Sequence, residues 1–101
     1  MPAKVRPIPE GYHSISPQIT CRDAARAIDF YKKVFGAKQL TRMDGPGGKV
    51  MHAEVKIGDS RIMLADEFPE MDARGPQSIG GTPVSLMLYF EDSDAVTARA
   101  V

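Results

Sequence analysis

The most informative stretch of this chain is residues 21–37, which predicts a helix with clear signals at both ends. Asp23 is a good N-cap residue, because its carboxylate can accept a hydrogen bond from an amide of the first turn. Gly36 can take the left-handed conformation that ends a helix. Apolar side chains recur between them at three- and four-residue steps, at Ala24, Ala27, Ile28, Tyr31 and Phe35. The pattern predicts one helix over residues 23–35 with a single buried face.

Alternating apolar and polar residues predict strands on both sides of this helix. One strand precedes it, over residues 14–21, and three follow it, over residues 38–43, 50–57 and 61–66. Glycine-rich turns separate the last three strands. The predicted order is therefore β-α-β-β-β. In the strand over 50–57, we expect the set Met51, Ala53, Val55 and Ile57 to face the helix.

The rest of the chain repeats part of this pattern. Residues 67–83 are rich in proline and glycine and predict a linker. Residues 84–91 then predict another strand, and Asp92 or Asp94 starts a helix that continues to Val101. Residues 16–23 align with 85–92 at an offset of 69 (85 − 16 = 69). Each copy is a strand followed by an acidic helix cap, which indicates a weak internal repeat.

The helical segment, Cys21-Arg22-Asp23 through Phe35-Gly36-Ala37, resembles the first helix of the vicinal oxygen chelate superfamily. That superfamily includes glyoxalase I, bleomycin-resistance proteins and extradiol dioxygenases. The stretch from His52 to Asp66 resembles its PhnB-like branch, and the likeness spans roughly residues 12–101. It implies an α+β fold made from two βαβββ modules.

Composition, periodicity and the resemblance together predict four parts of the chain. We expect an N-terminal arm over residues 1–12, the first βαβββ module over 13–66, a linker over 67–83, and the start of a second module over 84–101. A complete second module needs three more strands after its helix. Two interpretations stay open: a truncated product, or a compact natural variant that completes its sheet with a second copy.

The resemblance also implies where a metal would sit. Metal-dependent members place ligands in the first and last strands of each module. These positions correspond here to Ser16, Ser85 and about Met63. Hydroxyl and thioether groups bind divalent metals poorly. We therefore expect no metal and no other cofactor.

His52 and Glu54 lie two residues apart on one predicted strand, so they share a face, about 6.5 to 7 Å apart along the strand. We expect them to face the concave side of the sheet, where this superfamily holds its ligand, with Ser16, Gln18 and Met63 also lining the cavity. A histidine with a carboxylate partner can act as acid or base near neutral pH. The alternative is a solvated outer strand face that binds nothing.

The predicted function is that of a small-molecule-binding protein related to glyoxalases and bleomycin-resistance proteins, without the usual metal site. The alternative is a metal-dependent glyoxalase-type lyase or isomerase whose site a partner chain completes. A third option is a non-functional fragment. Unpaired sheet edges favour association, so we expect a homodimer in which residues 84–91 pair with strands of the partner.

Charge and cysteine content argue against other partners. The 13 basic and 13 acidic residues balance, which predicts no nucleic-acid surface and no basic membrane-binding segment. No apolar run approaches the length of a membrane helix. The single cysteine, Cys21, cannot form an internal disulfide, so we expect a cytoplasmic protein.

Overall fold

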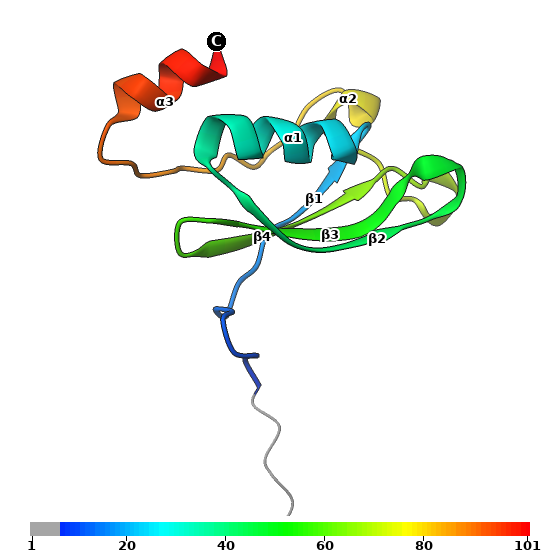
Figure 1. The fold of residues 1–101 in the computed structure, drawn as a ribbon. Coiled ribbons are helices and arrows are strands. Elements are labelled where there is room, and N and C mark those ends of the chain that lie inside the picture. The colour runs from blue at the N-terminus through cyan, green and yellow to red at the C-terminus, as the bar shows by residue number, and fades with distance from the viewer. Residues whose placement is uncertain (1–6) are drawn as a thin grey trace, which may run out of the picture.

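A four-stranded sheet with a helix across one side forms the centre of the computed structural model, which describes residues 7–101 (Figure 1). The strands are β1 (Gln18–Cys21), β2 (Lys38–Asp44), β3 (Val50–Ile57) and β4 (Ser60–Asp66), in the spatial order β1-β4-β3-β2. Strand β1 runs parallel to β4, and the other pairs are antiparallel. Helix α1 (Ala24–Phe35) connects β1 to β2. The predicted βαβββ order and the α+β class are confirmed.

The signals at both ends of α1 act as the sequence predicts. Asp23 Oδ1 accepts a hydrogen bond from the Arg26 amide at 3.2 Å. Gly36 has φ of 66°, and its amide donates to the carbonyl of Tyr31. A residue with a Cβ would be strained in this left-handed conformation.

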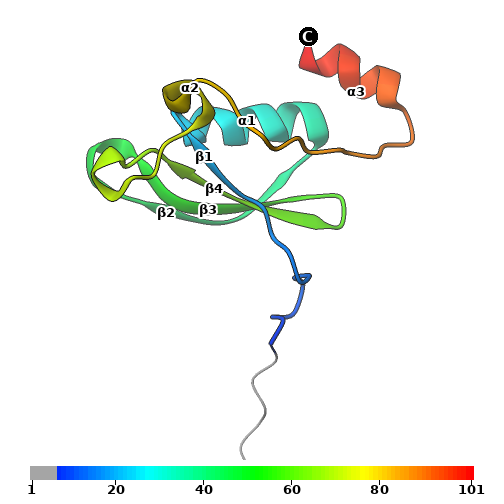
Figure 2. The ribbon, with the colours of Figure 1, turned by 180° about the vertical axis from the view of Figure 1, so that it is seen from behind.

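The core lies between α1 and the sheet. It consists of Ala24, Ile28, Ala37, Val50, Ala53, Val55, Ile57, Ile62 and Leu64. Three members of the predicted helical stripe, Ala27, Tyr31 and Phe35, are only partly buried. Val34, outside that stripe, is 1% exposed. Helix α3 (Ser93–Ala100) lies near the C-terminal end of α1 and contacts it (Figure 2). Its Arg99 Nε donates to the Val34 carbonyl at 3.1 Å.

A buried carboxylate, that of Asp66 at the end of β4, joins three elements. Its Oδ1 accepts from the amide of Ala24 at 2.8 Å, and its Oδ2 accepts from the amide of Val50 at 2.6 Å. Ala24 is the first residue of α1 and Val50 the first of β3. Asp66 is 6% exposed, so both hydrogen bonds are shielded from water. A carboxylate at a helix N-terminus also interacts favourably with the helix dipole.

Two predictions about strand ends are wrong. The first strand begins at Gln18 rather than at residue 14, and Ile15 is exposed because it precedes the point where β1 meets β4. In β3, Val50 is buried and Met51 is exposed, the reverse of the prediction. The pairing of β2 with β3 shifts register between Met43 and Asp44, which explains the reversal.

The predicted strand over residues 84–91 is not formed. This segment is extended, but none of its backbone groups pairs with a strand among the described residues. The alternation of a strand is still visible: Leu86 and Leu88 are less exposed than Met87 and Tyr89. Phe90 stacks on Phe35 with ring centroids 5.8 Å apart. The side-chain pattern is that of a strand, but no neighbouring strand supplies the hydrogen bonds.

The predicted linker contains local structure. Short helices η2 (Pro69–Met71) and α2 (Pro76–Ile79) lie within it, and a further turn, η1 (Pro46–Gly48), connects β2 to β3. Glu67 Oε1 accepts from the amide of Gly75 and from the Ser78 hydroxyl, each at 2.6 Å. These hydrogen bonds fold residues 67–78 back on themselves, and the Glu67 amide joins the start of the segment to β1 by donating to the Cys21 carbonyl at 2.9 Å.

The two helix caps that the sequence repeat aligns have similar geometry. Asp23 and Asp92, 69 residues apart (92 − 23 = 69), have similar backbone angles, with φ of −143° and −129° and ψ of 87° and 88°. Each carboxylate accepts from the amide three residues later, that of Arg26 or of Ala95. The two capped helices thus begin with the same local geometry.

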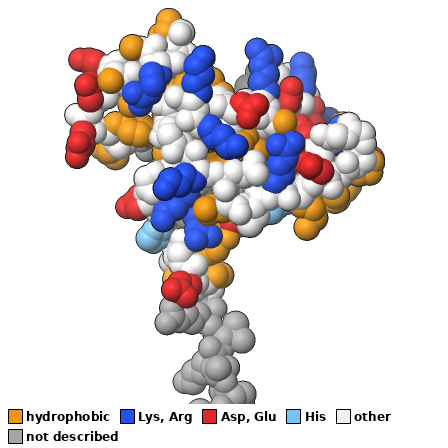
Figure 3. All heavy atoms as spheres, in the orientation of Figure 1, with side chains coloured by type: hydrophobic (Ala, Val, Ile, Leu, Met, Phe, Trp, Pro, Cys, Tyr) orange, Lys and Arg blue, Asp and Glu red, His pale blue; other side chains and the backbone are white. Residues whose placement is uncertain are grey.

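Basic and acidic side chains are both present on the face drawn in Figure 3, with no separation into one basic and one acidic half. Across residues 7–101, no helix has the length and apolar character needed to cross a bilayer.

We predict that Asp66→Asn lowers the free energy of unfolding by about 2 to 4 kcal/mol. The asparagine side chain has one acceptor oxygen and one NH2 donor, so only one of the two buried backbone amides, those of Ala24 and Val50, would keep its hydrogen bond. Leaving a buried donor unsatisfied costs about 1 to 3 kcal/mol. Urea denaturation followed by circular dichroism measures the change. The matched control is Asp72→Asn, whose side chain is 90% exposed and whose effect should stay within about 0.5 kcal/mol. Equal effects of the two substitutions would contradict a structural role for Asp66.

Candidate functional site

The face of the sheet opposite α1, called here the open face, carries most of the predicted site. Gln18 of β1 pairs with Met63 of β4, and Met63 pairs with Glu54 of β3. Directly paired residues share a face of the sheet. The neighbours Ile19, Leu64 and Ala53 pack toward α1, so Gln18, Met63 and Glu54 form one row on the open face.

Glu54 is a shielded charged group on the open face. Its side chain is 12% exposed. Oε1 accepts a short hydrogen bond from the Tyr12 hydroxyl, and Oε2 lies 3.3 Å from His52 Nε2. The Tyr12 hydrogen bond, with a smaller contribution from His52, lowers the pKa of Glu54 below its usual value. Glu54 is therefore ionised at neutral pH and keeps acceptor capacity toward the open face.

Tyr12 is a functional candidate that the sequence prediction missed. Residues 1–12 were interpreted as an arm, and the six described residues of that arm bring Tyr12 onto the open face. The Tyr12 ring also lies under the guanidinium of Arg61, which is 4.5 Å from the ring centroid. Tyr12 and Glu54 are 42 residues apart. No periodicity or motif connects them, so only the folded arrangement could reveal this contact.

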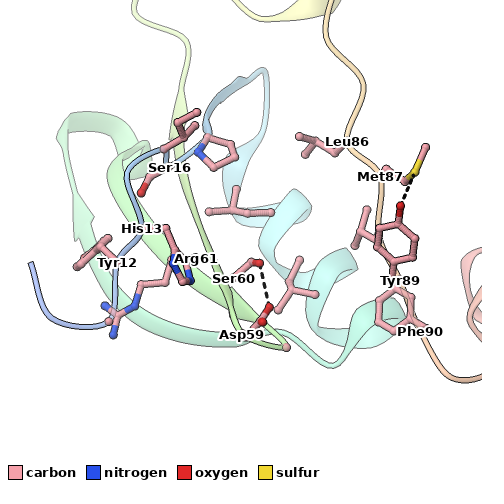
Figure 4. A pocket seen from close by; sticks show the side chains of 17 residues that line it. Tyr12, His13, Ser16, Asp59, Ser60, Arg61, Leu86, Met87, Tyr89 and Phe90 are labelled. Atoms are coloured by element: carbon pink, nitrogen blue, oxygen red, sulfur yellow. Dashed lines mark hydrogen bonds between the residues drawn. The ribbon is translucent and has the colours of Figure 1, made fainter. Parts of the chain in front are cut away.

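A cavity of about 370 Å³ lies beside this cluster (Figure 4). Its walls come from residues 11–17, from the β3–β4 hairpin at 57–62, and from residues 86–90. We call it the arm–hairpin cavity. Of the five predicted site residues only Ser16 lines it, because Gln18, His52, Glu54 and Met63 lie further along the sheet. The structure thus brings Gln18, His52, Glu54 and Met63 together on the open face, and Ser16, two residues before Gln18, lines the cavity beside them.

A second, more open cavity of about 590 Å³ lies between the end of β1, the outer side of α1 and Pro76. Cys21 lines it, but burial, followed by the nearby carboxylates of Asp66 and Asp23, raises the pKa of the thiol. A raised pKa leaves little thiolate at neutral pH, and the thiolate is the reactive form. This cavity therefore lacks an activated nucleophile at Cys21.

The polar groups of the open face provide two metal-binding side chains, His52 and Glu54, which lie next to each other. Residues 7–101 contain no group of three or more His, Cys, Asp or Glu side chains arranged to hold a metal ion. On the neighbouring strand, the residue paired with Met63 is Gln18 and not Ser16. The positions that the resemblance assigns to ligands thus carry a thioether and hydroxyls, a donor set that does not fit a divalent metal.

Comparison with known sequences identifies relatives of undefined activity. Two proteins of Mycobacterium tuberculosis strains and one of Mycobacterium bovis, all described as uncharacterized, are 44% identical to this chain over 91 residues. The match covers 87% of this chain and 54% to 60% of these relatives. The chain therefore spans a little over half of their length.

Comparison with solved structures gives the same fold. A gene product of Arabidopsis thaliana superposes with a TM-score of 0.67 at 20% identity, over 88% of this chain and 70% of that one. TioX from Micromonospora sp. ML1 superposes with a TM-score of 0.55 at 19% identity, over 87% of this chain and 68% of that one.

Residues 12–101 match the model of one protein family, and the matched part includes the whole βαβββ unit and the open-face residues Tyr12, Gln18, His52, Glu54 and Met63. The chain belongs to the Glyoxalase/Bleomycin resistance protein/Dioxygenase superfamily.

Proposed function

We propose that this chain is a small-molecule-binding member of the superfamily, of the PhnB-like branch, and that it holds its ligand on the open face without a catalytic metal. One observation carries the proposal. Glu54 is an ionised, shielded carboxylate that is held by Tyr12 and His52 on the face of the sheet that α1 leaves uncovered. A charged group this well shielded normally has a structural or a functional role.

The chemistry of the open face suits a ligand with hydrogen-bond donors. Each Glu54 oxygen can accept more than one hydrogen bond, and the ring of the partly exposed His52 can donate or accept. Gln18 adds an amide, and Met63 adds a flexible apolar surface in the same row. These groups can bind and orient a small polar molecule.

The alternative, a metal-dependent lyase or isomerase, would need more ligands than the open face offers. His52 and Glu54 provide two, whereas protein zinc sites normally use at least three protein ligands. A partner chain would have to supply the rest. The donor set of Ser16, Met63 and Ser85 supports the metal-free proposal instead.

We also propose that residues 84–101 begin a second module and that the chain forms a homodimer through this region. The shared cap geometry of Asp23 and Asp92 supports the first point. The unpaired extended segment, with Tyr89 88% exposed, supports the second, because such an edge can pair with another chain. Exchange of one element between copies is a low-cost route to a two-fold dimer.

The binding proposal is tested by nuclear magnetic resonance with a library of small polar compounds. We expect ligands to shift the resonances of Gln18, His52, Glu54 and Met63. We expect Glu54→Gln to weaken their binding about tenfold, the effect of losing one charge-assisted hydrogen bond. The matched control Glu70→Gln, an exposed residue of η2, should bind normally. Compounds that shift only distant residues would refute this site, and one tightly bound metal ion per chain would favour the metal-dependent alternative.

We predict that Tyr12→Phe raises the pKa of Glu54 toward its usual value near 4.5. The ionised form of Glu54 stabilises the fold above pH 4.5, and that contribution is lost as the pH falls through the lowered folded-state pKa. In the variant the contribution should be smaller, and its loss, which still begins near pH 4.5, should be complete at a higher pH than in the wild type. Carboxyl carbon resonances followed through an acid titration measure the pKa. Tyr89→Phe is the control, and an unchanged pKa in Tyr12→Phe would contradict the assigned hydrogen bond.

The assembly proposal predicts a dimer mass in light scattering at micromolar concentration. Leu86→Lys and Leu88→Lys, on the side of the segment that faces the protein, should shift the mass toward monomer because they place charge at the pairing strand. A stable, well-folded wild-type monomer under these conditions would refute dimerisation.

A further inference from the structure

We propose that the arm–hairpin cavity is a second binding site, specific for an organic anion with an apolar body, and that Arg61 recognises its charged group. Neither His52 nor Glu54 lines this cavity, so the inference goes beyond the ligand site proposed above.

The walls of the cavity select for an apolar body. Apolar side chains from three separate parts of the chain line it: Ile15 just after the arm, Ile57 and Ile62 of the hairpin, and Leu86 and Leu88 of the extended segment. At about 370 Å³ the cavity lies within the usual range for small-molecule sites, roughly 300 to 1,000 Å³. A compact ring system or a short hydrocarbon chain would replace water against these side chains.

Arg61 gives this apolar cavity one fixed positive charge. The guanidinium carbon lies 4.5 Å from the centroid of the Tyr12 ring, a cation–π contact that favours this position of the charge. Gly11 allows this arrangement, because a Cβ at that position would come within 2.5 Å of Arg61 Nη2. The arm backbone and the Tyr12 ring thus hold the guanidinium in place before any ligand binds.

The hydrogen-bonding capacity of Arg61 is unused within residues 7–101. No carboxylate of these residues lies within 4 Å of its guanidinium, and its buried Nε has no hydrogen-bond partner there. Nε is enclosed by protein, so we infer that a ligand contacts the terminal nitrogens of the guanidinium. A carboxylate, sulfonate or phosphate oxygen is the acceptor that matches such a fork.

The polar residues of the hairpin turn modify this charge only weakly. Asp59 also lines the cavity, and its carboxylate accepts from the Ser60 hydroxyl at 3.2 Å in an exposed turn. An exposed charge is largely screened by water and salt. Removing it in Asp59→Asn should strengthen anion binding slightly, which is the opposite sign to the effect expected at Arg61.

Two fluorescent probes of similar shape and different charge test the proposal. These are 8-anilinonaphthalene-1-sulfonate, an aryl sulfonate anion, and uncharged N-phenyl-1-naphthylamine. Wild-type protein should bind one sulfonate probe per chain saturably. Arg61→Met keeps much of the apolar stem, and it should weaken binding of the sulfonate about tenfold or more, while binding of the neutral probe changes less than about twofold.

Two further variants keep the test decisive. Arg74→Met removes an exposed arginine outside the cavity and should leave both probes unaffected. Asp59→Asn removes a negative charge from the cavity lining and should strengthen binding of the sulfonate slightly without changing that of the neutral probe. Wild-type binding that does not saturate, an unchanged sulfonate affinity in Arg61→Met, or equal losses for both probes would overturn the proposal. The magnetic resonance test of the open face follows other residues. Either proposal, the open-face site or the arm–hairpin site, can therefore be refuted while the other is supported.

Discussion

The carboxylate of Asp66 holds together the parts of the fold on which the rest depends. Its two oxygens accept from the first residue of α1 and the first residue of β3, and it stands at the end of β4, opposite Cys21 of β1. Hydrogen bonds to a charged acceptor contribute about 1.5 to 3 kcal/mol each. This contact fixes where α1 starts relative to the sheet, and the apolar residues Ala53, Val55 and Leu64 determine which side of the sheet α1 covers and which side stays open.

The open face follows from that arrangement. Because α1 covers Ala53, Val55 and Leu64, the alternate residues of the same strands point away from it. The arm places Tyr12 on the open face, where it contacts a residue of each proposed site. Its hydroxyl donates to Glu54, and its ring makes a cation–π contact with the guanidinium of Arg61. An acidic group and a basic group are thus positioned by one aromatic side chain.

The extended segment at residues 84–91 shows how far local pattern can specify a strand. Its side chains alternate in exposure as those of a strand do, and the helix after it begins with the same cap geometry as α1. A strand also requires a neighbour, since its backbone groups must pair with another chain segment. No described segment provides that neighbour. The side chains of residues 84–91 therefore alternate as in a strand, but their backbone groups form no inter-strand hydrogen bonds.

The sequence by itself determined the elements whose signals are local. The helix from Ala24 to Phe35 follows from its cap, its apolar spacing and Gly36, and the hairpin at Gly58 follows from its turn. The shared face of His52 and Glu54 follows from strand alternation.

Only the tertiary structure decided the contacts between distant segments, namely those of Tyr12, Asp66 and Arg61. The same holds for the register shift that buried Val50 and exposed Met51. Local patterns report on neighbours along the chain, whereas these features depend on which segments meet, and that is set by packing of the whole chain.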